Sequence, residues 1–116
     1  MSQISESEAA DLLSKLQVER IPLCAMLVSP SGAHARMPGF VDSITQDNGL
    51  VISVSGVPID TSRGYLQFSP FRSGCEYSFG DKRELPDNFR IESVGDSALV
   101  FRFLDTGERL ALFFTL

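Results

Sequence analysis

The spacing of apolar residues near the N-terminus predicts a helix. Apolar residues recur there every three or four positions, which places them on one helix face: Ala9, Leu12, Leu13 and Leu16. Ser5 stands three residues before Glu8, and this spacing is typical of a capping box at a helix N-terminus. Because Pro22 disfavours helical backbone at the residue before it, the helix is expected over about residues 5–20.

Beyond residue 22 the pattern changes to short apolar runs and alternating segments, which predict strands. The expected strand segments cover residues 23–28, 33–37 with its continuation 40–44, 50–54, 65–68, 75–79, 89–94, 98–104 and 110–115, which makes seven or eight short strands. Between two of them, Asn48-Gly49 is a strong hairpin signal, because both residues accept a positive φ. We therefore expect a single domain over residues 1–116, of the α+β class and mainly β. The N-terminal helix packs on a small antiparallel β-barrel or curled sheet of about seven strands over residues 22–116.

Pro38-Gly39 interrupts the alternation of apolar and polar residues, which resumes after it in shifted phase. A Pro-Gly step inside a strand pattern indicates a bulge or a sharp bend. On this interpretation the substitution Gly39→Val should destabilise the fold by about 1–3 kcal/mol, because a β-branched residue would enter a special backbone conformation.

The last two expected strands are apolar on both faces. Leu99, Phe101 and Phe103 alternate with Ala98 and Val100, and residues 110–114 are all apolar. One short helix cannot cover both faces, and exposed apolar area of this extent is usually an interaction surface. The pattern therefore predicts a homodimer through the C-terminal strands, or contact with another protein. The alternative is a monomer in which the helix and the polar loop expected at residues 80–87 together bury this surface.

Composition narrows the class of protein. The 116 residues are 43% hydrophobic and 22% charged, which is typical of a globular domain. The net charge of −5 argues against a nucleic-acid polymer as partner, because phosphate binding needs clustered Lys and Arg. Neither a secretion signal nor an apolar run long enough for a bilayer is evident, so a cytoplasmic location without membrane contact is expected. Cys24 and Cys75 are expected to be small buried residues, with a disulfide as the alternative.

No catalytic or metal-binding motif stands out in the sequence. His34 is the only histidine, and no Cys, Asp or Glu stands at ligand spacing from it. Nucleophile elbows, phosphate-binding glycine loops and CxxC pairs are missing as well. These observations favour a non-enzymatic protein without catalytic residues, metal or cofactor. In the polar segment 60–64, Arg63 could bind a phosphate together with backbone donors, or it could be a solvated turn residue.

Two residues between positions 20 and 54 follow a family pattern. Arg20 precedes a strand, and Asp42 follows the next strand, before a glycine and a further apolar run. This order resembles that of the PilZ domain, a small bacterial β-barrel whose typical members bind cyclic di-GMP. The resemblance implies a barrel fold, and it makes Arg20 and Asp42 candidate contacts of an anionic ligand.

The chain also departs from the PilZ pattern. That pattern has a second Arg four residues after the first, and then Asp or Asn-x-Ser-x-x-Gly before an apolar strand. In this chain Cys24 stands at the second Arg position, Ile44 stands at the Ser position, and Gly49 comes two residues later than the pattern places its Gly. Since paired arginines would hold the guanine edges and phosphates, these departures argue against the family's own ligand.

The sequence therefore favours a non-enzymatic binding or protein-interaction module. The first alternative is a degenerate PilZ-like sensor that binds a nucleotide or another small anion through Arg20, Asp42 and Arg63. The second alternative is a small split-barrel flavoprotein.

Overall fold

The computed structural model describes residues 1–45, 49–54, 65–70, 74–85 and 95–116. Its elements in chain order are β1 (Ser2–Ile4), α1 (Glu6–Val18), β2 (Leu23–Val28), β3 (His34–Thr45), β4 (Gly49–Val54), β5 (Tyr65–Phe68), β6 (Cys75–Asp81), the 3-10 turn η1 (Lys82–Glu84), β7 (Ser97–Phe103) and β8 (Arg109–Phe114). The strands form one sheet in the order β1-β6-β7-β8-β2-β3-β4-β5, and all neighbours are antiparallel. The predicted α+β, mainly β class is confirmed. The sheet is curled and is not closed among the described strands, so of the two predicted forms, barrel or curled sheet, the structure has the curled sheet.

The start of α1 follows the predicted capping box. The backbone N–H of Glu8 donates to Ser5 Oγ over 3.1 Å, and the Ser5 N–H donates to Glu8 Oε1 over 3.2 Å. Both bonds satisfy backbone donors that have no partner within the helix.

The end of α1 is a Schellman motif. The Arg20 N–H donates to the Gln17 carbonyl over 3.2 Å, and the Ile21 N–H donates to the Leu16 carbonyl over 3.1 Å. This closure requires a left-handed residue, and Arg20 has φ +48°. The helix therefore stops at Val18, two residues before the predicted end.

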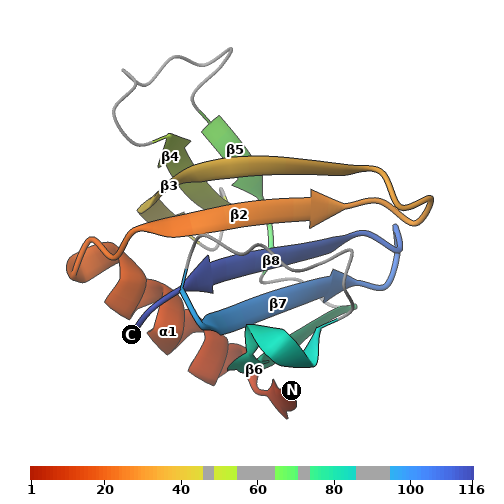
Figure 1. Cartoon of the computed structure of the whole chain (residues 1–116), viewed down its shortest axis with the longest axis horizontal. Coiled ribbons are helices and arrows are strands. Elements are labelled where there is room, and N and C mark those ends of the chain that lie inside the picture. The colour runs from red at the N-terminus through yellow and green to blue at the C-terminus, as the bar shows by residue number, and fades with distance from the viewer. Residues whose placement is uncertain (46–48, 55–64, 71–73, 86–94) are drawn as a thin grey trace.

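The curl of the sheet forms a concave inner face, and α1 closes one end of it. Figure 1 shows α1 lying across the end of the sheet, where it contacts both β3 and β6. Three helix residues are completely buried there: Ala9, Leu13 and Leu16. They join inward-facing strand residues, including Leu99, Phe101 and Leu112, in the main core.

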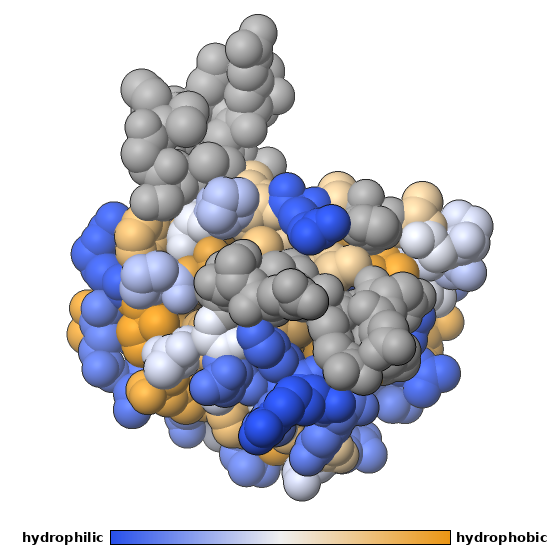
Figure 2. All heavy atoms as spheres, viewed as in Figure 1, coloured by the Kyte–Doolittle hydropathy of each residue, from blue (hydrophilic) through white to orange (hydrophobic). Residues whose placement is uncertain are grey.

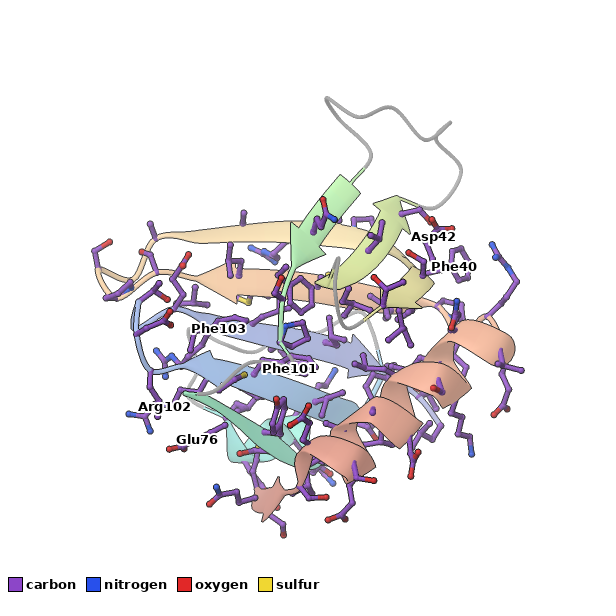
Figure 3. All side chains as sticks on the ribbon, turned by 180° about the vertical axis from the view of Figure 1, so that it is seen from behind. Phe40, Asp42, Glu76, Phe101, Arg102 and Phe103 are labelled. Carbon is purple, nitrogen blue, oxygen red and sulfur yellow. The ribbon has the colours of Figure 1, made fainter. Side chains whose placement is uncertain are left out.

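The two sides of the curled sheet meet through aromatic side chains. The ring centroid of Phe68 on β5 lies 5.7 Å from that of Phe101 and 6.3 Å from that of Phe103, both on β7. The Tyr77 hydroxyl on β6 donates to the Pro70 carbonyl over 2.6 Å. Figure 3 shows β5 crossing the concave face, with Phe101 and Phe103 labelled on the strand behind it.

The outer face of β2, β7 and β8 carries a second apolar cluster. Its buried members are Cys24, Met26, Val28, Ala98, Ala111 and Phe113. Partly buried Leu85 and Val100 pack against them. Because Ala111 and Phe113 are fully buried within one chain, the reason for predicting a dimer through these strands does not hold. In the coloured parts of Figure 2, which views the molecule from the same side as Figure 1, hydrophobic areas are small and interspersed with hydrophilic ones.

The bulge predicted at Pro38-Gly39 is wrong. Gly39 pairs regularly with Leu23 on one side and Val54 on the other, inside the single strand β3. The register instead shifts between Val41 and Ser43. Among the described residues Pro38 pairs only with Cys24 of β2, so no described residue of β4 needs a donor from the proline nitrogen.

Other differences concern segment ends. The strand β1 was not predicted, and it pairs with β6 at the sheet edge. The segment expected to be a loop after residue 79 begins with the end of β6 and continues into η1. The expected strand at 89–94 and the residue Asn48 lie outside the described part of the chain. Gly49 has the positive φ that the hairpin signal requires, +82°.

Candidate functional site

Two of the three predicted ligand contacts lie at one corner of the sheet, where α1 ends beside β3. The guanidinium carbon of Arg20 is 4.8 Å from the ring centroid of Phe40, which is a cation–π contact. Asp42, the extra residue of the bulge, is exposed, and its backbone carbonyl accepts a hydrogen bond from Gln17 Nε2 over 3.1 Å. Figure 3 shows Phe40 and Asp42 close together at this corner. Arg63 lies outside the described residues.

The acidic, cysteine and histidine side chains were the remaining candidates for chemistry. Within the described ranges, no group of three or more His, Cys, Asp or Glu side chains could hold a metal ion. The two cysteines do not form a disulfide with each other. Cys24 is buried, as predicted, whereas Cys75 is only partly buried. Burial raises the pKa of the Cys24 thiol, which lowers the fraction of the reactive thiolate. The side chain of His34 lies outside the described part.

The end of the curled sheet opposite α1 is open, and it contains a cavity of about 360 Å³. We call this cavity the mouth. Its wall comes from β2, β5, β7, β8 and the β7–β8 hairpin: Leu27, Gln67, Phe68, Ser69, Phe103, Thr106, Glu108 and Leu110. Apolar side chains form the depth of the mouth, since Phe103 and Leu110 are buried. Exposed Gln67, Ser69 and Thr106 form its rim.

The hairpin between β7 and β8 positions Glu108 at the mouth. The Phe103 N–H donates to the Glu108 carbonyl over 2.9 Å, and the Glu108 N–H donates to Thr106 Oγ1 over 3.2 Å. Gly107, with φ +75°, donates its N–H to the Phe103 carbonyl over 2.8 Å. The carboxylate of Glu108 takes no hydrogen bond or ion pair from any described residue. It is therefore an available acceptor beside an aromatic cavity.

A second, smaller cavity of about 250 Å³ lies at the β2–β3 turn. It shares the lining residues Leu27 and Glu108 with the mouth, and its other lining residues are Ser29, Ala33 and Ala35. Glu108 therefore lines two neighbouring cavities.

The sequence contained only part of this site. The alternation in the strand around residue 101 placed Phe103 on the same face as Leu99 and Phe101, and in the structure that face is the inner one. The approach of Phe68 from the far edge of the sheet has no local signal, because it depends on how strongly the sheet curls. Glu108 lies between the last two expected strands, where no sequence signal distinguishes it, and it lines the mouth because the curl brings β5 to the opposite wall.

In the described part of the chain, no helix has the length and apolar character needed to cross a bilayer.

The chain was also compared with known families, curated proteins and solved structures. None of these comparisons finds a match. The resemblance to the PilZ domain therefore stays a prediction, carried by Arg20 and Asp42 alone.

Proposed function

We propose that this chain is a non-enzymatic binding module, and that its ligand is a small amine with an apolar body held in the mouth. The observation that carries the proposal is the Glu108 carboxylate beside a cavity walled by Phe68 and Phe103. Ligand sites in curled and barrel-like sheets commonly lie at an open end, where a few polar groups meet an apolar wall.

The size and chemistry of the mouth support this class of ligand. Its volume of about 360 Å³ is within the usual range of small-molecule sites, which begins at about 300 Å³. The faces of the two phenylalanine rings are electron-rich and attract cations. A carboxylate strengthens that preference, and it can accept a hydrogen bond from an ammonium group.

Calorimetric titration with three matched compounds tests the proposal. The compounds are 2-phenylethylamine, 2-phenylethanol and phenylacetate, which share an aromatic body and differ in charge. We expect the amine to bind most tightly and the carboxylate least. The variant Glu108→Gln should weaken the amine by about tenfold and leave the alcohol unchanged, because it removes one charge-assisted hydrogen bond.

Glu76→Gln is the matched control. Glu76 lies on β6 and takes no part in the mouth wall, so its loss should leave all three affinities unchanged. The variant Ser69→Trp should fill the rim and remove binding of both the amine and the alcohol. The proposal is wrong if no compound binds at about 10 mM, or if Glu108→Gln binds the amine as tightly as the unaltered chain.

A second candidate function is the anion sensor at the Arg20 corner. It is supported by the closeness of Arg20 to Phe40, with Asp42 at the neighbouring bulge. A thermal-shift screen with cyclic dinucleotides tests it, with Arg20→Gln as the variant because glutamine keeps the left-handed backbone strain and loses the charge. If a cyclic dinucleotide raises the melting temperature of the unaltered chain but not that of Arg20→Gln, the result favours this sensor over the amine module. The flavoprotein alternative requires a yellow purified protein.

A further inference from the structure

Two arginines stand side by side on the outer face of the sheet, away from the mouth. Arg102 on β7 and Arg109 on β8 are direct partners in the antiparallel ladder. The Cβ atoms of such partners are about 4.5–5.5 Å apart, so both side chains leave the same face of the sheet next to each other.

Both arginines line one external cavity. Its volume is about 440 Å³, and its other walls include Pro30 from the β2–β3 turn and Gly107 from the β7–β8 hairpin. The two turns are in close contact, because a Cβ added to Gly107 would lie 3.0 Å from Pro30 Cγ. The cavity therefore lies beside two packed turns, and Arg102 and Arg109 are among its lining residues.

The pairing places two like charges next to each other. Like charges directly opposite each other on neighbouring strands repel. Glu76 on β6 is the ladder partner of Arg102 on its other side. The side chain of Arg102 nevertheless forms no hydrogen bond or ion pair with any described residue. Figure 3 shows Glu76 and Arg102 at the end of the sheet away from Phe40 and Asp42. The described part of the chain thus leaves the charge of Arg102 without a direct counterion.

We propose that Arg102 and Arg109 bind a phosphoryl dianion in this cavity. Each guanidinium presents a planar fork of N–H donors. A carboxylate has two oxygens, and one fork occupies both of them. A phosphoryl group has at least three terminal oxygens and a charge near −2, so it can accept hydrogen bonds from two forks at once.

The site is separate from the mouth and does not depend on it. Side chains alternate across a strand, so Arg102 and Arg109 lie on the face opposite Phe101, Phe103 and Leu110. The cavity also lies at a different place from the Arg20 corner. The strand β2 begins at Leu23, beside that corner, and its other end, Val28, pairs with Arg109.

Titration of the 15N-labelled chain with sodium phosphate, methyl phosphate and sodium acetate tests the proposal. We expect saturable shifts at the Arg102 side-chain Nε–H and the Gly107 amide with both phosphates, and none that saturate with acetate. Equal affinity for the two phosphates would identify free phosphate as sufficient, whereas tighter binding of methyl phosphate would identify a phosphate monoester as the ligand.

The variants Arg102→Gln and Arg109→Gln should each weaken phosphate binding by about tenfold, and adding salt should weaken it further in the unaltered chain. Arg36→Gln is the matched control, because Arg36 is an exposed arginine on β3 outside the cavity. Equal affinity of Arg102→Gln and Arg36→Gln would overturn the proposal. Shifts that never saturate, or that acetate reproduces, would overturn it as well.

Discussion

Arg20 has a backbone conformation that most side chains avoid. It closes the Schellman motif of α1 with φ +48°, at the position where glycine is the usual residue. We expect Arg20→Gly to be more stable than Arg20→Ala by about 1 kcal/mol, because only glycine adopts this conformation without a steric penalty. Both variants lose the contact with Phe40, so their difference isolates the backbone. Urea unfolding of the two variants measures it, and equal stability would show that the helix end rearranges.

Gly49 combines a left-handed conformation with a close approach of β5. Its φ is +82°, and an added Cβ would lie 2.0 Å from the Phe68 carbonyl oxygen. Gly74 has nearly the same φ, +80°, with no atom within 4 Å of an added Cβ. We expect Gly49→Ala to lower the free energy of unfolding by at least about 2 kcal/mol more than Gly74→Ala does. Comparable losses in urea unfolding would mean that β5 moves away from β4 at little cost.

At the scale of elements, η1 depends on the carboxylate of Asp81. Asp81 Oδ1 accepts from the Arg83 N–H over 2.8 Å and from Arg83 Nε over 3.0 Å, and Asp81 Oδ2 accepts from Arg83 Nη2 over 2.7 Å. The side-chain hydrogen bonds from Arg83, followed by the backbone bond, lower the pKa of Asp81 to about 2. A carboxyl whose pKa is lowered in the folded state stabilises the fold above its ordinary pKa of about 4, and this contribution disappears as the pH falls toward 2.

The variant Asp81→Asn tests this dependence, because asparagine keeps the capping oxygen and loses the charge. We expect the unaltered chain to be more stable than Asp81→Asn at about pH 6, and the difference to shrink below about pH 4. Urea midpoints measured across this range give the answer. A difference that is constant down to about pH 2 would show that the charge is not what stabilises η1.

Elements with local signals were predicted closely. The strands β2 and β5 match their expected ranges, and the Ser5 capping box fixes the start of α1 as expected. Errors arose where long-range pairing decides the structure. The change of phase that the sequence suggested at Pro38-Gly39 lies at Asp42 instead, where β3 has a bulge. Along its length β3 pairs first with β2 and then with β4, and this long-range pairing decides where the bulge falls. The strand β1 is too short to show a pattern and exists through its pairing with β6.

At the scale of the whole molecule, the mouth depends on the curl of the complete sheet, which the sequence does not show. The mouth requires Phe68 from one edge of the sheet to meet Phe103 near the other, and no pattern within either strand encodes that meeting. The homodimer stays a prediction, and it would have to use a surface other than the buried Ala111 and Phe113. Light scattering tests it, since a mass near 12.7 kDa that does not rise with concentration would exclude a dimer.

The curl itself is held by a bond across the open side of the sheet. The Tyr77 hydroxyl on β6 donates to the carbonyl of buried Pro70, just after β5, and the Tyr77 ring packs edge-on against Phe101 with centroids 5.8 Å apart. Strands at opposite ends of the sheet order are thereby joined. Burial first, followed by the negative charges of Cys75 and Glu6, raises the pKa of the Tyr77 hydroxyl above its ordinary value of about 10.

Tyr77→Phe should lower the free energy of unfolding by about 1–3 kcal/mol at neutral pH, because it leaves a buried carbonyl without its donor. A hydroxyl whose pKa is raised by folding contributes its stability below its unfolded pKa, and the contribution is lost as the pH rises above about 10. The difference between the unaltered chain and Tyr77→Phe should therefore shrink above about pH 10 in urea unfolding. Hydrogen exchange at neutral pH should speed up at the amides of β5 more than at those of β8, since β5 is the strand that the bond secures. Unchanged exchange in β5 would mean that the contact between Phe68 and Phe101 holds the curl without the tyrosine.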